Sequence, residues 1–331
     1  MTALATPGAR QVVELPGSPG LGALYARAGL ASGRAAVGGP LRRALGSGRG
    51  GRGGASAPVL PAVEHRVTGL RPDPGALTAY QHLLGEPAGD VLPAGYVHVL
   101  AFPAAIALIV RPDFPMPPLG IVHLANRVEQ RSPLRVGDVL DVRAWAQDLR
   151  PHRKGAQVDL VTEVRRSGTD PADPDAAPAW RGVSTYLAPG VRVPGEVPAD
   201  PARAAFTAPD PTGRWVLDAG TGRRYAAVSG DANPIHLTPL TARALGFPQA
   251  IAHGMYTAAR ALADVGARRG DAYTWDVEFA APVLLPSSPA VRVGPRPDPH
   301  GGDGWSVVVW DGKRNKPHLT VEVTPLGRDV R

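Results

Sequence analysis

The sequence predicts an α+β fold in which a long apolar helix packs against a curved antiparallel sheet, and it predicts this arrangement twice. Two apolar helix candidates, at 96–110 and 254–265, are each followed by several strand candidates. A helix that is hydrophobic on all sides, such as 96–110, belongs inside a fold, commonly against a sheet. In the strand at 274–279, Trp275, Val277 and Phe279 alternate with two acids, which indicates a half-buried antiparallel strand.

The other elements follow in the same order in both halves, which suggests a divergent duplication. In the first half we expect a short helix at 75–84, strands at 120–128, 139–149, 157–164 and 183–187, and an exposed loop at 167–178. In the second half we expect a short helix at 223–229 and strands at 274–279, 290–293, 306–310 and 319–324. We therefore divide the chain into an N-terminal repeat (61–190), a Pro-rich linker (191–211) and a C-terminal repeat (212–331).

Residues 1–60 form an N-terminal segment that we expect to be flexible. Residues 31–58 are mostly Gly, Ala, Arg and Ser, and such a composition buries too little apolar surface to become ordered. A short helix is expected at 21–30. The glycines Gly46, Gly48 and Gly51 match the dinucleotide-binding pattern GxGxxG, but no strand precedes them and no helix follows, so the match is attributed to composition.

Charge and composition exclude several classes of function. The net charge is +7, but residues 1–60 contain seven arginines and one acid, so the rest of the chain is nearly neutral and we expect no nucleic-acid partner. The absence of cysteine excludes disulfides, thiolate metal sites and a cysteine nucleophile. The N-terminus lacks the pattern of a signal peptide and no apolar run is long enough to span a membrane, so we expect a cytoplasmic protein.

One short segment carries the candidate chemistry. Asp231 and His236 are five residues apart, and on a continuous helix they would lie about 140° apart around the axis. Pro234 prevents such a helix and biases Asn233 toward an extended backbone, so the chain must turn and can bring both side chains to one point. An Asp and a His that share a pocket are suited to general acid–base catalysis.

Gly254 supplies what such a pair lacks, a stabiliser of negative charge on a carbonyl oxygen. It opens the second apolar helix, where backbone N–H groups have no partner within the helix and the helix dipole is positive. Glycine also lets a ligand approach the backbone closely. The sequence therefore predicts an oxyanion hole at this helix start. Thr238, with Pro239 after it, is expected to cap a further short helix.

The strings SGDANPIH (229–236) and GFPQAIAHGM (246–255) resemble the hydratase motif of the MaoC-like family of R-specific enoyl-CoA hydratases and 3-hydroxyacyl-thioester dehydratases. Weaker similarity extends over most of residues 60–330 and resembles the bacterial members with two repeats. The resemblance implies a double hot-dog fold, in which each repeat is a curved sheet wrapped around one long helix and the N-terminal repeat is degenerate. One departure is Thr238, because many members have an acid at this position.

The same resemblance implies the function and the site. Asp231 and His236 would be the catalytic pair, the Gly254 N–H would hold the thioester oxygen, and Asn233 would brace the loop. Ser229 and His253 are assigned supporting roles. The substrate would be an acyl-CoA or an acyl-carrier-protein thioester, handled without a cofactor or a metal, by a monomeric pseudo-dimer or a homodimer.

Alternatives remain open at this point. Taken singly, Asp231 in a Gly-Asp-Ala-Asn-Pro string is more often turn chemistry than catalysis, and only the conjunction of both spacings favours a site. A hot-dog thioesterase and a non-catalytic acyl-binding subunit share the predicted fold. The histidines of the first half, His98, His123 and His152, have no Asp at matching spacing and are interpreted as structural or as lining a pocket.

Overall fold

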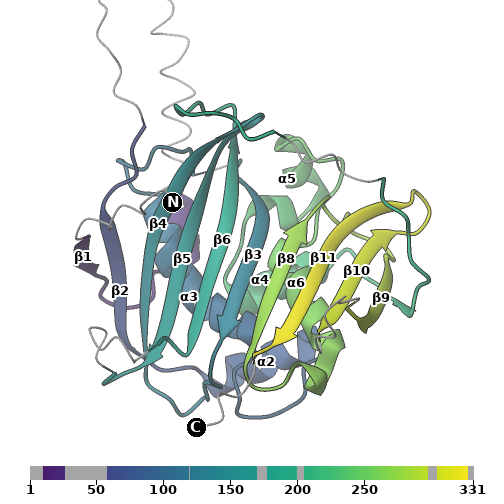
Figure 1. Cartoon of the computed structure of the whole chain (residues 1–331), viewed down its shortest axis with the longest axis horizontal. Helices are drawn as coiled ribbons and strands as arrows, with labels where there is room; N and C mark the ends of the chain where they lie inside the picture. Colours follow the sequence, from purple (N-terminus) through teal and green to yellow (C-terminus); the bar gives the residue numbers. More distant parts are fainter. Residues whose placement is uncertain are drawn as a thin grey trace, which may run out of the picture.

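A computed structural model describes residues 10–26, 58–118, 120–169, 177–199, 205–296 and 304–326. Its strands form one sheet in the order β1-β2-β4-β5-β6-β3-β8-β11-β10-β9-β7 (Figure 1). Apart from the parallel pair β1–β2, neighbouring strands are antiparallel. The strands are β1 (Gln11–Glu14), β2 (Val63–Leu70), β3 (Val122–Gln130), β4 (Leu140–His152), β5 (Gly155–Arg166), β6 (Trp180–Pro189), β7 (Gly213–Arg214), β8 (Tyr273–Phe279), β9 (Ala290–Pro295), β10 (Trp305–Asp311) and β11 (Lys316–Pro325).

The helices gather on one face of this sheet and lie behind the strands in Figure 1. The two long ones are α3 (Ala94–Ile109), which packs on β2, β4, β5 and β6, and α6 (Gly254–Val265), which packs on β8, β10 and β11. The others are α2 (Pro74–Leu84), α4 (Thr221–Ser229), α5 (Pro239–Ala244) and the 3₁₀ helices η1 (Pro234–His236) and η2 (Gly266–Arg269). Most residues of α3 and α6 are buried, so each helix fills the concave side of its own half of the sheet.

The predicted α+β class and double hot-dog architecture are confirmed, with a helix and a curved sheet in each half. The two halves of the sheet join edge to edge, because β3 of the N-terminal repeat pairs with β8 of the C-terminal repeat along the register from Ala125–Glu278 to Gln130–Tyr273. The buried side chains of β8 include Trp275 and Val277, as the alternation predicted. The repeat boundaries stay predictions.

The N-terminal segment differs from the expectation. We expected residues 1–60 to be flexible, but residues 10–26 are folded against the body of the protein. Strand β1 pairs with β2, with Gln11 opposite Val63, and a helical stretch covers residues 21–26. Leu21 and Leu24 are buried in the core, which supplies the apolar contacts that order the segment. The GxGxxG match at 46–51 lies outside the described residues, as does most of the loop expected at 167–178.

None of the helices in the described part of the chain is long and apolar enough to cross a membrane.

Candidate active site

The segment between α4 and η1 places Asp231 and His236. Helix α4 ends at Gly230, which adopts the left-handed conformation at φ 72° and turns the chain sharply. Asn233 is extended, as the following proline requires, and its side chain accepts a hydrogen bond from the Ile235 N–H to begin η1. Ser229 Oγ accepts a hydrogen bond from the Asp231 N–H at 3.2 Å. Local sequence therefore shapes this loop, and the side chains of Ser229 and Asn233 both accept hydrogen bonds from its backbone.

Three hydrogen bonds tie this loop to the segment that leads into α6. The Ile251 N–H donates to the Ile235 carbonyl at 3.1 Å. His236 Nδ1 lies 2.8 Å from the Ile251 carbonyl, and His253 Nε2 lies 2.8 Å from the Asp231 carbonyl. As a result, ligand-type atoms of Asp231, His236 and His253 all lie within 4.8 Å of one another. The structure thus brings together the acid and the imidazole that the sequence singled out.

The hydrogen bond of His236 fixes its tautomer. A carbonyl oxygen only accepts, so Nδ1 carries the hydrogen and the lone pair of the neutral ring is on Nε2. Burial, and secondarily the neighbouring His253, lower the pKa of His236 to about 3. The ring is therefore neutral at physiological pH. The lone pair on Nε2 is therefore available to accept a hydrogen bond or a proton.

His253 contacts the loop that holds Asp231 and His236. It is 2% exposed and stacks on His236, with ring centroids 3.7 Å apart. Burial is the main cause that lowers its pKa, so the contact of 3.9 Å to the Asp231 carboxylate is not an ion pair. Its Nε2–H donates to the Asp231 backbone carbonyl, and its supporting role stays a prediction.

The same three side chains have the types that ligate transition metals. One ring nitrogen of His236 and one of His253 are already hydrogen-bonded to carbonyl oxygens. We expected no metal ligand set from the sequence, because neither the spacing HxxxH nor any cysteine is present. The convergence of the three groups arises from the loop and not from one helix face.

Gly254 is the first residue of α6, as predicted. Its N-cap residue, His253, makes no side-chain capping hydrogen bond, and the Gly254 N–H donates to no described group. A side-chain carbon at position 254 would lie 3.2 Å from Cε1 of Phe279, so glycine avoids crowding against this ring. The unpaired N–H at the positive end of a 12-residue helix has the physical character of an oxyanion hole.

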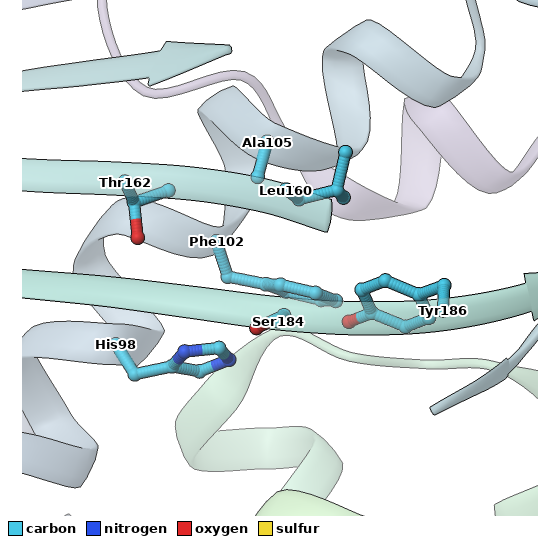
Figure 2. A pocket seen from close by; sticks show the side chains of 7 residues that line it. All are labelled: His98, Phe102, Ala105, Leu160, Thr162, Ser184 and Tyr186. Carbon is cyan, nitrogen blue, oxygen red and sulfur yellow. The ribbon is translucent and has the colours of Figure 1, made fainter. Parts of the chain in front are cut away.

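A small hollow, with room for about one water molecule, lies between α3 and the strands β5 and β6. Figure 2 shows His98 and Phe102 of α3 facing Ser184 and Tyr186 of β6 across it. Burial lowers the pKa of His98 to about 4, and the Asp231 charge opposes this shift, which places the hollow near Asp231. His98 therefore lines a pocket, which is one of the two interpretations we gave for it.

Aromatic rings connect the hollow with the start of α6. His123 stacks on Tyr186 at 4.5 Å and contacts Phe279 at 4.8 Å between ring centroids, and Phe279 borders Gly254. Burial lowers the pKa of His123 to about 3, so this ring is neutral as well. His152, in contrast, accepts a hydrogen bond from the Lys154 N–H in the β4–β5 turn and is structural.

Sequence reasoning missed one member of the site. Tyr25, in the helical stretch of the N-terminal segment, donates a hydrogen bond from its hydroxyl to Asp231 Oδ1 at 2.5 Å. The two residues are 206 positions apart, and no spacing pattern links them. Thr238, the departure noted above, accepts a hydrogen bond from the Thr241 N–H and caps α5, as predicted.

Comparison with known proteins agrees with this geometry. Residues 207–294, which contain the loop and the start of α6, match the model of the MaoC like domain. The chain is 38% identical over 275 residues to the 3-hydroxyacyl-thioester dehydratase X of Mycobacterium tuberculosis, a match that covers 81% of this chain and 94% of that protein.

Solved structures show the same fold. The crystal structure of HtdX of Mycobacterium tuberculosis is similar with a TM-score of 0.67 and 36% identity, over 80% of this chain and 100% of that one. A MaoC-like dehydratase from Phytophthora capsici is similar with a TM-score of 0.60 over 80% of this chain and 95% of that one, but at 20% identity this likeness concerns the fold alone.

Proposed function

Because this chain belongs to the family of MaoC-like dehydratases, we propose that Asp231 and His236 catalyse the reversible addition of water to the double bond of trans-2-enoyl thioesters. In the reverse direction the same site dehydrates (3R)-hydroxyacyl thioesters of fatty acid metabolism. The enzyme is accordingly a hydro-lyase. The substrate is the thioester of coenzyme A or of an acyl carrier protein.

One observation carries the assignment of the residues. The hydrogen bonds between residues 231–236 and 251–253 hold a carboxylate, a neutral imidazole with a free Nε2 and an unpaired helix N–H around one region. A hydratase needs these three groups, because it must bind and deprotonate water and must stabilise an enolate.

The proposed reaction proceeds as follows. The thioester carbonyl oxygen accepts a hydrogen bond from the Gly254 N–H, which stabilises the negative charge that develops there. Asp231 and His236 Nε2 hold a water molecule, and His236 takes its proton as the oxygen bonds to C3. The electrons of the C2–C3 double bond move toward the carbonyl, and C2 then takes a proton from the catalytic pair. Microscopic reversibility gives dehydration by the same groups.

The neighbouring hollow supports a place for the acyl chain. Phe102, Ala105 and Leu160 give it apolar walls, and the row of rings from Phe279 to Tyr186 leads to it from Gly254. With its head at Gly254, an acyl chain that follows this row points toward the space between α3 and β5, which must widen to admit it. A graded series of enoyl-CoA lengths tests this placement through KM.

The test of the catalytic pair is hydration of crotonyl-CoA by Asp231→Asn and His236→Ala. General acid–base catalysis contributes about 10²- to 10⁴-fold, so we expect losses in kcat of this order in each variant with the fold retained. The matched controls are the exposed residues Asp90→Asn and His82→Ala, which should hydrate crotonyl-CoA at the wild-type rate. Near-normal turnover by either site variant would remove this assignment.

The same assay separates the alternatives. A hot-dog thioesterase would release free coenzyme A, which a thiol reagent detects, whereas a hydratase consumes the enoyl absorbance without releasing thiol. An acyl-binding subunit would bind enoyl-CoA but leave it unchanged when purified alone. Chiral analysis of the product, with both coenzyme A and acyl-carrier-protein substrates, checks the (3R) configuration and the carrier.

A further inference from the structure

The N-terminal segment is anchored at the edge of the sheet. Besides the β1–β2 pairing, the Gln11 N–H donates to the Ala62 carbonyl at 2.8 Å and the Leu15 N–H donates to the Arg66 carbonyl at 2.8 Å. The Arg10 guanidinium lies 4.8 Å from the ring centroid of Trp145. These contacts fix where the following residues can reach, so the segment approaches the active site from the side of the N-terminal repeat.

Beyond this anchor, the helical stretch 21–26 docks directly on the catalytic loop. Leu21 and Leu24 are each 5% exposed and belong to the hydrophobic core. Leu21 Cδ1 lies 3.4 Å from the position that a side chain on Gly230 would occupy, one residue before Asp231. The buried face of this stretch therefore sets the position of Tyr25 relative to the Asp231 carboxylate.

The hydroxyl of Tyr25 completes the hydrogen bonding of one carboxylate oxygen. Asp231 Oδ1 accepts from the Tyr25 hydroxyl at 2.5 Å and from the Asn233 N–H at 3.3 Å. Burial of Tyr25 and the neighbouring Asp231 charge raise the pKa of the phenol, so that it stays protonated and acts as the donor. With Oδ1 held by two donors, Oδ2 is the oxygen that faces His253 and remains for a reacting water.

We propose that Tyr25 is a positioning residue of this active site, which the N-terminal segment delivers to Asp231 in order to fix the carboxylate for the water. The proposal rests on the function proposed for Asp231. A hydrogen bond between a phenol and a carboxylate is of the charge-assisted, strong kind, and it selects one carboxylate rotation. The N–H of Asn233, which lies on the loop itself, donates to the same oxygen. The carboxylate is thereby held by one residue of its own loop and by one residue 206 positions away in the chain.

The test is Tyr25→Phe, which removes one oxygen atom and keeps the ring that packs in the segment. Because a hydrogen bond to a charged group carries about tenfold to a hundredfold in an equilibrium or a rate, we expect kcat on crotonyl-CoA to fall by about this factor. KM should change by less than about twofold. The matched control is Tyr80→Phe, since Tyr80 is fully buried and its hydroxyl has no hydrogen-bond partner among the described residues. Its kcat should equal that of the wild type.

Two outcomes would overturn the proposal: a kcat of Tyr25→Phe equal to that of the wild type, or a higher one. A higher kcat, or an unchanged kcat with a raised KM, would indicate that the segment covers the site or contacts substrate instead. Amide hydrogen exchange at residues 11–14 shows whether β1 stays paired with β2 in each variant. Asp231→Asn is measured in parallel. If it is inactive while Tyr25→Phe is normal, only the role of Tyr25 fails, whereas an active Asp231→Asn removes the proposed function.

Discussion

The backbone of His253 makes position 254 a place where proline fits. His253 has φ −60° and ψ 137°, the extended geometry that the residue before a proline prefers. Position 254 is the first residue of α6, where proline is favoured because its missing N–H has no partner in the helix. The N–H of residue 254 can therefore be removed without removing the helix, which isolates the proposed oxyanion donor.

We predict that Gly254→Pro lowers kcat by about 10²- to 10³-fold, the loss typical of one oxyanion-hole donor. Gly254→Ala is the matched control, because it keeps the N–H but adds a side-chain carbon against Phe279, as proline does. The difference in kcat between the two variants measures the contribution of the N–H. The fall in kcat that both variants share relative to the wild type measures the crowding against Phe279. Equal rates in the two variants would remove the N–H from the mechanism. Circular dichroism checks that α6 is retained.

The sequence predicts those residues of the proposed site that lie close together in the chain. Asp231, His236 and Gly254 fall within 24 positions, and Pro234 and the helix start fix their geometry locally. The sequence does not predict the hydrogen bond of Tyr25 with Asp231, because this contact depends on the pairing of β1 with β2 at the edge of the sheet. Nor does it predict the depressed pKa of His236, which arises from burial by residues of other elements.

Among the elements, α4 and η1 are packed so closely that only glycine fits between them. A side-chain carbon on Gly222 would overlap the backbone carbonyl of His236, and backbone cannot move aside as a flexible side chain would. The position of His236 thus depends on a helix to which none of the proposed catalytic residues belongs.

We therefore predict that Gly222→Ala displaces η1, destabilises the fold by about 1 to 3 kcal/mol through overpacking, and lowers kcat. A displacement of about 1 Å can cost on the order of 10²-fold in rate, so a loss of at least tenfold is expected. Gly137→Ala, where an added carbon meets nothing within 4 Å, is the control and should leave both quantities unchanged. Urea denaturation and crotonyl-CoA hydration measure the two effects. A fully active Gly222→Ala would mean that η1 tolerates the shift.

Element patterns explain which secondary structure the sequence predicts. The helices α3 and α6 and the strands from β3 to β6 and β8 to β11 were expected, because their apolar periodicity is strong. Strand β2 was missed because Glu64 and His65 interrupt its apolar pattern, yet both are buried. Arg143 and Arg66 pair with Glu64 at 2.6 Å each, and the contact with Arg143, 79 positions along the chain in β4, cannot be predicted from a local pattern.

In the whole molecule, ion pairs also join the two repeats, in addition to the backbone pairing of β3 with β8. Arg127 of β3 pairs with Asp276 of β8 at 3.0 Å on the surface. Glu86, which follows α2, pairs with Arg269 of η2 at 2.7 Å, and the Glu86 side chain is only 2% exposed. The edge-to-edge junction could not be predicted from sequence, since the pattern of β8 specifies a half-buried strand but not its neighbour.

The buried pair Glu86–Arg269 should matter far more to stability than the exposed pair. Removing one partner of a buried pair leaves the other charge without compensation, and this typically costs about 3 to 5 kcal/mol. Arg269 is 14% exposed, and it also donates to the Leu262 carbonyl, so we place Glu86→Gln at the lower end of that range. The double variant Glu86→Gln/Arg269→Met should recover most of the loss, because it removes the stranded charge.

Arg127→Met is the control that also spans the two repeats. Its side chain is 64% exposed, so its pair with Asp276 should contribute less than about 1 kcal/mol. Urea denaturation of the wild type and of the three variants gives their free energies of unfolding. Comparison of the fluorescence and circular dichroism transitions shows whether the two repeats still unfold together. If Glu86→Gln costs no more than Arg127→Met, the link between the repeats lies in the β3–β8 junction and the helix contacts alone. If the double variant is as unstable as Glu86→Gln, the loss of stability comes from disrupted packing around the pair and not from the uncompensated charge of Arg269.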